Sequence, residues 1–266
     1  MSVTRVLRQG GRISAEPHRW PLGLWAQAFR RVGRPWLIGR HARRLCQPLT
    51  VEGAEQFAEV RSPALIVANH TSHVDTLIVL SVLPRILHSR VAIAAAADRF
   101  YTSALKGAWF SLRYNAYPIT RGGGSRALAH SEWLLQHGWS LLIFPEGKRS
   151  RTGELLPFHP GPAILALRHG VPVLPLYIAG AAEMLRPGYR WAQPAPVAVH
   201  VGAPLMLDPA VGVAEATEAI QEAVRALRPA SVDAGATSLL GLQPTAPDLD
   251  GVEVPEPLTV PGQRHV

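Results

Sequence analysis

Short apolar runs alternate with longer amphipathic stretches along most of this 266-residue sequence. The short runs have the length and composition of buried β-strands, and they cover residues 49–52, 64–69, 91–97, 116–119, 139–144, 173–178 and 197–201. The longer stretches have helical spacing, and they cover residues 76–83, 102–112, 125–137, 162–169 and 214–227. Strands that alternate with helices form sheets covered on both faces. We therefore predict an α/β fold with one mixed, largely parallel sheet flanked by helices.

The length of the chain allows one large domain with a buried core, and two complete domains would be cramped. We expect three regions: a basic N-terminal segment at 1–47, a folded domain at 48–228, and a disordered, acidic tail rich in proline and glycine at 229–266. Cys46 is the single cysteine, which excludes an internal disulfide and favours a reducing compartment.

Positive charge is concentrated at the N-terminus. The whole chain carries a formal charge of +8, and its first 50 residues contain ten arginines and one acid, Glu16. Such an excess favours an anionic partner: nucleic acid, a membrane surface or a phosphorylated substrate. Nucleic acid is the least favoured of these, because no helix-turn-helix, zinc-finger or RNA-binding signature accompanies the arginines. We therefore expect an anionic membrane surface as a partner and no nucleic acid.

Residues 20–46 have the composition of a helix that lies in a membrane interface. Trp25, Phe29, Val32 and Trp36 fall at helical spacing, and arginines are interleaved with them. Pro35 is expected to kink or split this helix. The alternative is a helix that packs its apolar side on the core and leaves a solvated basic face. The sequence shows neither a secretory signal nor an apolar run long enough to span a bilayer, so we predict peripheral or monotopic attachment to the cytoplasmic face of a membrane.

The segment ALIVANHTSHVD, residues 64–75, passes from an apolar run to side chains capable of proton chemistry. On one continuous helix, residues five apart point roughly 140° apart, so His70 and Asp75 can meet only if His70 precedes the helix. Ser72 is a good N-cap, which would place Asp75 in the first turn. A histidine held by a carboxylate suits general-base catalysis. Two alternatives stay open: a variant capping box formed by Ser72 and Asp75, and a metal site formed by His70, His73 and Asp75.

Three further motifs lie at strand ends. In AYPITRGGG, residues 116–124, a strand delivers Arg121 to three glycines that precede a helix, an arrangement compatible with phosphate binding. In LLIFPEGKRSRTGELLPF, residues 141–158, a buried strand leads into one acid and two bases. In VPVLPLYIAG, residues 171–180, two prolines bracket a strand, which usually indicates an edge strand or a bulge.

Taken together and in this order, the four motifs resemble those of the glycerolipid acyltransferase family, which includes the 1-acylglycerol-3-phosphate acyltransferases. NHTSHVD resembles the first block, YPITR the second, FPEGKRS the third and VPVLPLYI the fourth. The resemblance covers residues 48 to about 205 and identifies 48–228 as a catalytic domain.

The resemblance implies a reaction and a set of site residues. His70 would deprotonate the free hydroxyl of lysophosphatidic acid with Asp75 orienting it, and the hydroxyl would attack the thioester of acyl-CoA or acyl-carrier protein to give phosphatidic acid. The substrate-binding residues implied by the motifs are Arg121, Glu146, Gly147, Lys148 and Arg149. Backbone N–H groups near Gly147 would stabilise the oxyanion. No metal and no cofactor beyond the acyl thioester co-substrate is expected.

Two departures from the family pattern concern the acceptor. Lys148 stands where the family usually has threonine, and Phe158-His159-Pro160-Gly161 stands where the family commonly has Phe-Lys-x-Gly. The alternatives are therefore an acyltransferase for another lysolipid or a non-phosphorylated acceptor, a non-catalytic lipid-binding relative, and a metal-dependent hydrolase.

Overall fold

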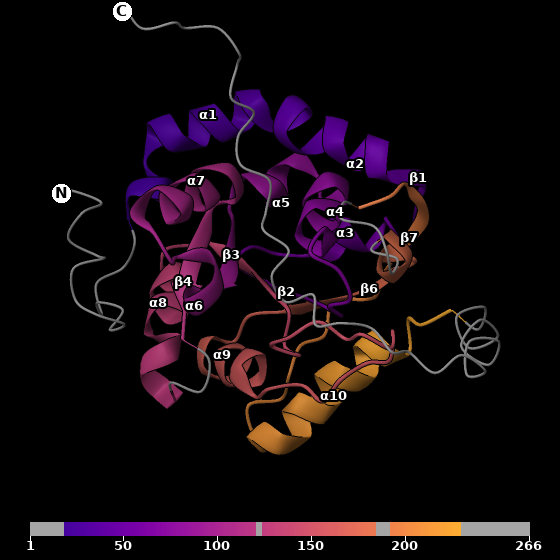
Figure 1. Cartoon of the computed structure of the whole chain (residues 1–266). Coiled ribbons are helices and arrows are strands. Elements are labelled where there is room, and N and C mark those ends of the chain that lie inside the picture. The colour runs from indigo at the N-terminus through magenta and orange to yellow at the C-terminus, as the bar shows by residue number, and fades with distance from the viewer. Residues whose placement is uncertain (1–18, 121–123, 185–191, 230–266) are drawn as a thin grey trace, which may run out of the picture.

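The computed structural model describes residues 19–120, 124–184 and 192–229. Its centre is a seven-stranded sheet in the order β1-β7-β6-β2-β5-β3-β4 (Figure 1). All neighbouring strands are parallel except β6 and β7. The strands are β1 (Cys46–Glu52), β2 (Leu65–Ala68), β3 (Val91–Ala96), β4 (Ala116–Ile119), β5 (Ser140–Ile143), β6 (Val173–Ala179) and β7 (Ala195–Val201). This confirms the predicted mixed, largely parallel sheet and each of its strands.

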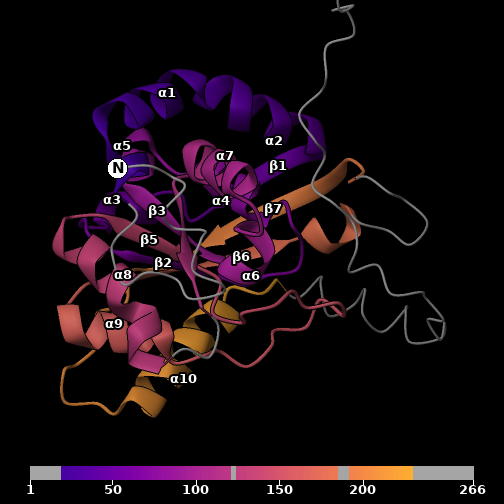
Figure 2. The same ribbon diagram turned by 60° about the vertical axis from the view of Figure 1, so that its left-hand side comes forward.

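Helices cover both faces of the sheet (Figures 1 and 2). One face carries α8 (Gly124–Gln136), α9 (Gly161–His169) and α10 (Val213–Arg225). The other carries α4 (Asp75–Val82), α5 (Arg85–Ser89) and α7 (Ala104–Tyr114), with α1 (Leu24–Arg34) and α2 (Arg40–Leu45) outside them. The shorter helices include η2 (Trp20–Leu22), α3 (Gln56–Glu59), α6 (Ala97–Phe100) and η4 (Ala181–Met184). Helices α3, α5, α6 and η4 were not predicted from the sequence.

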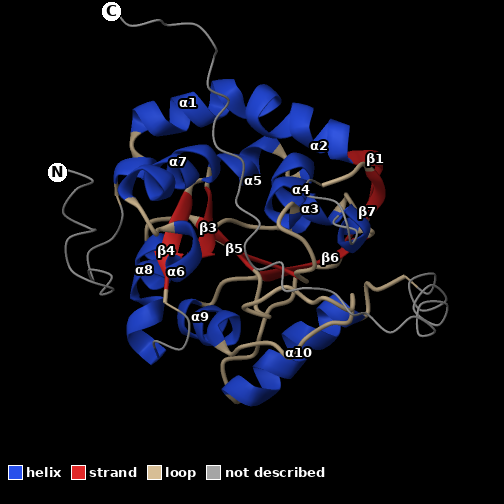
Figure 3. Cartoon of the chain, viewed as in Figure 1, coloured by secondary structure: helices blue, strands red, loops and turns tan. Residues whose placement is uncertain are grey.

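The two-sided cover explains why the central strands are apolar without interruption. In β2, Leu65 and Val67 join the core under α8, α9 and α10, whereas Ile66 and Ala68 join the core under α4 and α5. All four residues are buried, as expected for a parallel strand between two helical layers. Figure 3 shows the strands, in red, between the helices, in blue. Because β6, β2, β5, β3 and β4 are mutually parallel, their carboxyl ends meet at one edge of the sheet.

Strand β6 is not an edge strand, although Pro175 lies inside it and a proline usually indicates an edge or a bulge. The strand pairs with β2 on one side and β7 on the other. The carbonyl of Pro175 accepts a hydrogen bond from the N–H of Gly202 at 3.0 Å, and Gly202 lies just beyond the end of β7. Because N–H and C=O of one strand residue point to the same side, the missing N–H of Pro175 falls where the ladder with β7 has ended.

The N-terminal helices present their apolar side outward. Trp25 is 59% exposed and Trp36 is 66% exposed, and Leu24, Phe29 and Val32 are exposed with them. The α-helical pattern of α1 ends at Arg34, and a π-helical turn, η3 (Pro35–Gly39), follows before α2, which confirms the predicted interruption at Pro35. These large side chains therefore do not pack on the core, whereas Ile38 and Ala42 of the same segment are buried in it, so the alternative of core packing holds in part. Within the described ranges, no helix is both long and apolar enough to span a membrane.

Arginine side chains attach α1 to the folded domain. Arg30 donates to the carbonyl of Leu112 in the last turn of α7, and Arg34 donates to those of Leu80 and Leu83 at the end of α4. These carbonyls lack partners within their own helices, so a cation there also complements the helix dipole. Burial lowers the pKa of Arg30 to about 10, still well above neutrality. The half-buried Arg30 and Arg34 thus hold α1 while its aromatic side chains face solvent.

Candidate active site

The site begins where β2 ends, at Asn69. The side-chain oxygen of Asn69 accepts from the N–H of Ile178 at 2.7 Å, and its amide nitrogen donates to the carbonyl of Ile178 at 3.0 Å. The side chain therefore takes the place of main-chain pairing with β6 just after the last residue of β2. The backbone is free to turn away from the sheet here, and His70 is the first residue after the turn.

Asp75 holds the loop that carries His70. Its Oδ2 accepts from His70 Nδ1 at 2.8 Å and from the backbone N–H groups of Thr71 at 2.7 Å and Ser72 at 2.8 Å. The side chain of Asp75 is fully buried, and Asp75 is the first residue of α4. The predicted contact between His70 and Asp75 is confirmed. The predicted N-cap role of Ser72 is wrong, because α4 starts three residues later, with Val74 at the N-cap position and no side-chain cap.

The Asp75 carboxylate sets the proton arrangement of the His70 ring. A carboxylate can only accept, so Nδ1 carries the proton and Nε2 is left as the basic nitrogen. The ring stacks on Phe144 with centroids 4.5 Å apart, and 21% of the His70 side chain is exposed. The capping-box alternative holds in part, because Asp75 also accepts from Ser72. One carboxylate thus both closes the loop and orients the imidazole.

The turn after β5 forms hydrogen bonds with both the N–H and the carbonyl of His70. The N–H of His70 donates to Glu146 Oε1 at 2.7 Å, and the carbonyl of His70 accepts from the N–H of Ser150 at 2.7 Å. Gly147 lies between them with φ of +66°, a conformation that favours glycine. Its N–H donates to the carbonyl of Phe144 at 3.1 Å, so this N–H, one of those expected to bind the oxyanion, is already engaged in the turn.

Glu146 is a buried carboxyl group between two loops. It is 2% exposed, and its second oxygen accepts from the N–H of Leu156 at 3.0 Å. Burial raises the pKa of Glu146 to about 7, and the Asp75 charge adds to this effect. The hydrogen bonds from His70 and Leu156 and the charge of His70 act in the opposite direction. The carboxyl group therefore changes its charge near neutral pH.

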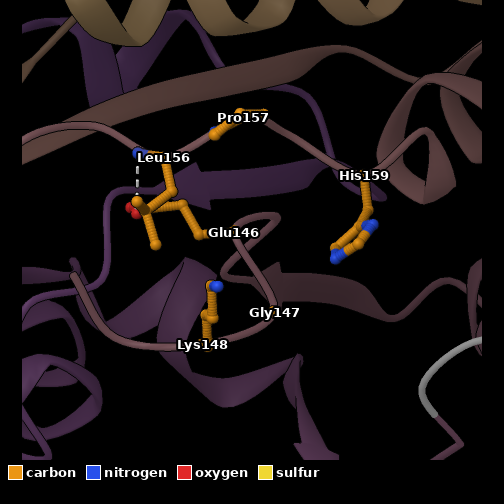
Figure 4. A pocket seen from close by; sticks show the side chains of 6 residues that line it. All are labelled: Glu146, Gly147, Lys148, Leu156, Pro157 and His159. Carbon is orange, nitrogen blue, oxygen red and sulfur yellow. Dashed lines mark hydrogen bonds between the residues drawn. The ribbon is translucent and has the colours of Figure 1, made fainter.

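A cavity of about 400 Å³ opens beside this turn (Figure 4). Its lining residues are Glu146, Gly147, Lys148, Leu156, Pro157 and His159. The side chains of Lys148 and His159 reach the cavity from different segments. His159 is fixed by its N–H, which donates to the carbonyl of Pro145 at 2.9 Å, and its ring lies so close to Gly147 that a Cβ there would come within 2.9 Å of it. The cavity can accept a small polar group beside a cation.

The structure unites most of the residues that the sequence singled out. His70, Asp75 and Glu146 are connected by hydrogen bonds, and Glu146, Gly147 and Lys148 line the cavity. Arg149 is half-buried in the same turn. Arg121 lies outside the described residues, as do residues 230–266 of the expected tail.

Arg99 was not predicted as a site residue. It follows β3 on α6, and its guanidinium lies 3.2 Å from Nε2 of His73. The two residues are 26 positions apart, so no local spacing could reveal their contact. Among the residues that the structure describes, no group of three or more His, Cys, Asp and Glu side chains is arranged to hold a metal ion. His73, the third member of the alternative metal site, contacts Arg99 instead.

Comparison with known proteins adds independent findings. A family model for acyltransferases matches residues 48–179. A 1-acyl-sn-glycerol-3-phosphate acyltransferase of Cocos nucifera is 32% identical over 177 residues, which are 65% of this chain and 52% of that protein. A lyso-ornithine lipid O-acyltransferase of Pseudomonas aeruginosa is 32% identical over 151 residues, which are 56% of this chain and 54% of that protein. The chain thus spans about half the length of these relatives.

A solved structure has the same fold. The crystal structure of the 1-acyl-sn-glycerophosphate acyltransferase PlsC from Thermotoga maritima matches with a TM-score of 0.57 and 24% sequence identity. The match covers 76% of this chain and 77% of that one. The α/β arrangement described above is therefore shared with a known protein.

Proposed function

The chain belongs to the glycerolipid acyltransferase family, and on this premise we propose that it transfers a fatty acyl group from a thioester to the free hydroxyl of lysophosphatidic acid. The product would be phosphatidic acid, a precursor in phospholipid biosynthesis. The observation that carries the proposal is the hydrogen bond of 2.8 Å between His70 and Asp75 at the carboxyl edge of the sheet, with a cavity beside the turn that grips His70.

The proposed chemistry is direct transfer. Nε2 of His70 takes the proton of the acceptor hydroxyl while its oxygen attacks the thioester carbonyl, and Asp75 stabilises the imidazolium that forms. The tetrahedral intermediate then collapses, the carbon–sulfur bond breaks, and the proton on His70 passes to the leaving thiolate. No acyl-enzyme forms, and each turnover consumes one hydroxyl and one thioester and yields one ester and one thiol. The thioester donor is acyl-CoA or acyl-carrier protein.

In this proposal the acceptor headgroup binds in the cavity beside the turn after β5. Lys148 supplies one cation there, and Arg149 follows it in the same turn. Cations at this position favour a phosphomonoester, since charge-assisted hydrogen bonds to phosphate are among the strongest available. Arg121 belongs to the same proposed phosphate set by the resemblance of its motif.

We propose that the enzyme works at the cytoplasmic face of a membrane, attached through the N-terminal helical segment formed by α1, η3 and α2. The exposed Trp25, Phe29 and Trp36 would enter the headgroup region, and the exposed Arg31, Arg40, Arg43 and Arg44 would meet anionic lipid. Lysophosphatidic acid and phosphatidic acid both reside in such a surface. The attachment is peripheral or monotopic in this proposal.

A second acceptor is favoured by one relative. The Pseudomonas aeruginosa protein is named for a lyso-ornithine lipid, and this chain departs from the family pattern at Lys148 and His159, both of which line the cavity. The discriminating experiment is transfer of a radiolabelled acyl group, from acyl-CoA and from acyl-carrier protein, to lysophosphatidic acid, lyso-ornithine lipid and lysophosphatidylcholine.

Labelling of lysophosphatidic acid at least tenfold faster than the other two supports the proposal. If lyso-ornithine lipid is labelled faster, the acyltransferase chemistry stands and the phosphate roles of Lys148 and Arg149 fall. If neither donor labels any acceptor, the proposed activity is wrong and a lipid-binding relative is favoured.

A further inference from the structure

Glu146 joins three segments that are distant in the sequence. It sits in the turn after β5, its Oε1 accepts from the backbone of His70 after β2, and its Oε2 accepts from the backbone of Leu156 in the loop before α9. Leu156 is itself part of the cavity wall. One buried carboxyl group therefore connects the catalytic loop to the wall of the proposed acceptor site.

This geometry differs from that of a headgroup ligand. In Figure 4 the carboxyl group of Glu146 is directed to the backbone nitrogen of Leu156, on the other side of the cavity from His159. Both of its oxygens are occupied by backbone donors, and only 2% of the residue is exposed. Each oxygen can accept a further hydrogen bond, but a bound acceptor has almost no access to a group that the protein covers so completely.

We propose that Glu146 is a positioning residue, whose carboxylate fixes the His70 loop against the wall of the acceptor cavity and so sets the place of the base relative to the bound hydroxyl. The inference rests on the proposed function, because it assigns the cavity to the acceptor. The bond from Ser150 to the carbonyl of His70 holds the loop from the other side, which leaves the N–H of His70 as the contact that Glu146 controls.

The two bonds are strongest in the ionised form. Both oxygens of a carboxylate are strong acceptors, whereas the hydroxyl oxygen of a protonated carboxyl group is a weaker acceptor and its O–H needs a partner of its own. The titratable groups around Glu146 are His70, Asp75, Lys148 and His159, which come from the two loops, α4 and the same turn. Because the pKa of Glu146 is raised to about 7, the clamp loosens as the pH falls through neutrality.

The test compares Glu146→Gln with Glu154→Gln. The glutamine keeps the shape of the side chain but offers only one acceptor and sets an NH₂ group against the second N–H. Glu154 is an exposed carboxylate of the same loop, paired with Arg228, and serves as the matched control. We expect Glu146→Gln to lower kcat roughly 10- to 100-fold, with KM for acceptor and donor within roughly threefold of wild type, and Glu154→Gln to change neither.

The pH profile gives a readout that a merely structural role would not move. In the wild-type protein Glu146 must be ionised for the clamp to form, so its ionisation contributes to the acid limb of log kcat against pH. In Glu146→Gln this ionisation is absent, and the acid limb loses one unit of slope. A Glu146→Gln variant that keeps kcat and raises KM for the acceptor alone would overturn the proposal and make Glu146 a headgroup ligand.

Hydrogen–deuterium exchange separates failure of this inference from failure of the proposed function. Without any substrate, the backbone amides of residues 70–75 should exchange at least tenfold faster in Glu146→Gln than in Glu154→Gln, while β2 stays protected. Unchanged exchange in this loop would contradict the clamp even in an active enzyme. Faster exchange in a protein that labels no lysolipid would retain the clamp and reject the acyltransferase reaction.

Discussion

At the active site the polar side chains are buried and bonded to backbone, whereas on α1 the large apolar side chains are exposed and two arginines are turned inward. Asp75 and Glu146 together accept five hydrogen bonds. Four come from residues 70–72, and the fifth comes from the backbone of Leu156. Trp25 and Trp36 are more than half exposed, while Arg30 and Arg34 donate to the ends of α7 and α4. The first arrangement fixes atoms for a reaction, and the second leaves an apolar surface for a partner.

The two regions should therefore fail in different ways. A substitution at the site should remove turnover and leave membrane binding, and a substitution on the outer face of α1 should do the reverse. The next three predictions test this separation, in decreasing order of expected effect.

The largest effect is expected from Asp75→Asn. Oδ2 accepts all three bonds, so an asparagine oxygen can replace it. The amide, however, lacks the negative charge that stabilises the imidazolium, and it places a buried NH₂ at the Oδ1 position, where none of the described residues offers a hydrogen-bond partner. We expect kcat to fall roughly 10³-fold or more, with binding to anionic vesicles unchanged. Asp208→Asn, at an exposed turn that binds the N–H of Ala210, is the matched control. Comparable kcat values for the two variants in a steady-state assay would remove Asp75 from the mechanism.

A smaller effect is expected on the pH dependence of the free energy of unfolding. Because the folded protein raises the pKa of Glu146 from 4.5 to about 7, the neutral form is favoured in the fold. The resulting stabilisation is complete below pH 4.5 and is lost as the pH rises through 7. We expect the free energy of unfolding of the wild-type protein to fall by up to about 3 kcal/mol relative to that of Glu146→Gln between pH 4.5 and pH 7, as measured by denaturant unfolding. A parallel pH dependence of the two proteins would contradict the raised pKa.

The smallest effect is expected on the outer face of α1 and the following turn η3. The double substitution Trp25→Ala and Trp36→Ala removes two exposed aromatic side chains and should weaken sedimentation with anionic vesicles roughly tenfold or more. Turnover of a short-chain, water-soluble lysophosphatidic acid should stay within roughly twofold. Met206→Ala, which removes an exposed apolar side chain from the loop before α10, should leave vesicle binding intact. Equal vesicle binding by all three proteins would reject α1 as the membrane contact.

Local sequence patterns were sufficient for the sheet and for the central contact of the site. The apolar runs predicted every strand because buried parallel strands have no polar alternation, and the spacing of His70 and Asp75 required the histidine to precede the helix. The start of α4 was misplaced because Ser72 is a good N-cap by composition, yet Asp75 already closes that turn by accepting from Ser72.

Long-range geometry could not be read from the same patterns. Helical spacing of Trp25, Phe29, Val32 and Trp36 defines a face but does not say whether the face meets the core or solvent; the contacts of Arg30 and Arg34 decide this. The bond between Glu146 and His70 joins residues 76 positions apart, and that between Arg99 and His73 depends on how α6 leaves β3. Only the folded chain brings these groups together.

The most direct test of the proposed reaction is transfer of a labelled acyl group to lysophosphatidic acid by wild type, His70→Ala and His137→Ala. His137 is an exposed histidine stacked on Trp133, and its variant controls for the loss of an imidazole elsewhere. The account predicts labelled phosphatidic acid from wild type and His137→Ala, and a rate at least roughly 10³-fold lower from folded, vesicle-bound His70→Ala. Undiminished transfer by His70→Ala would contradict it.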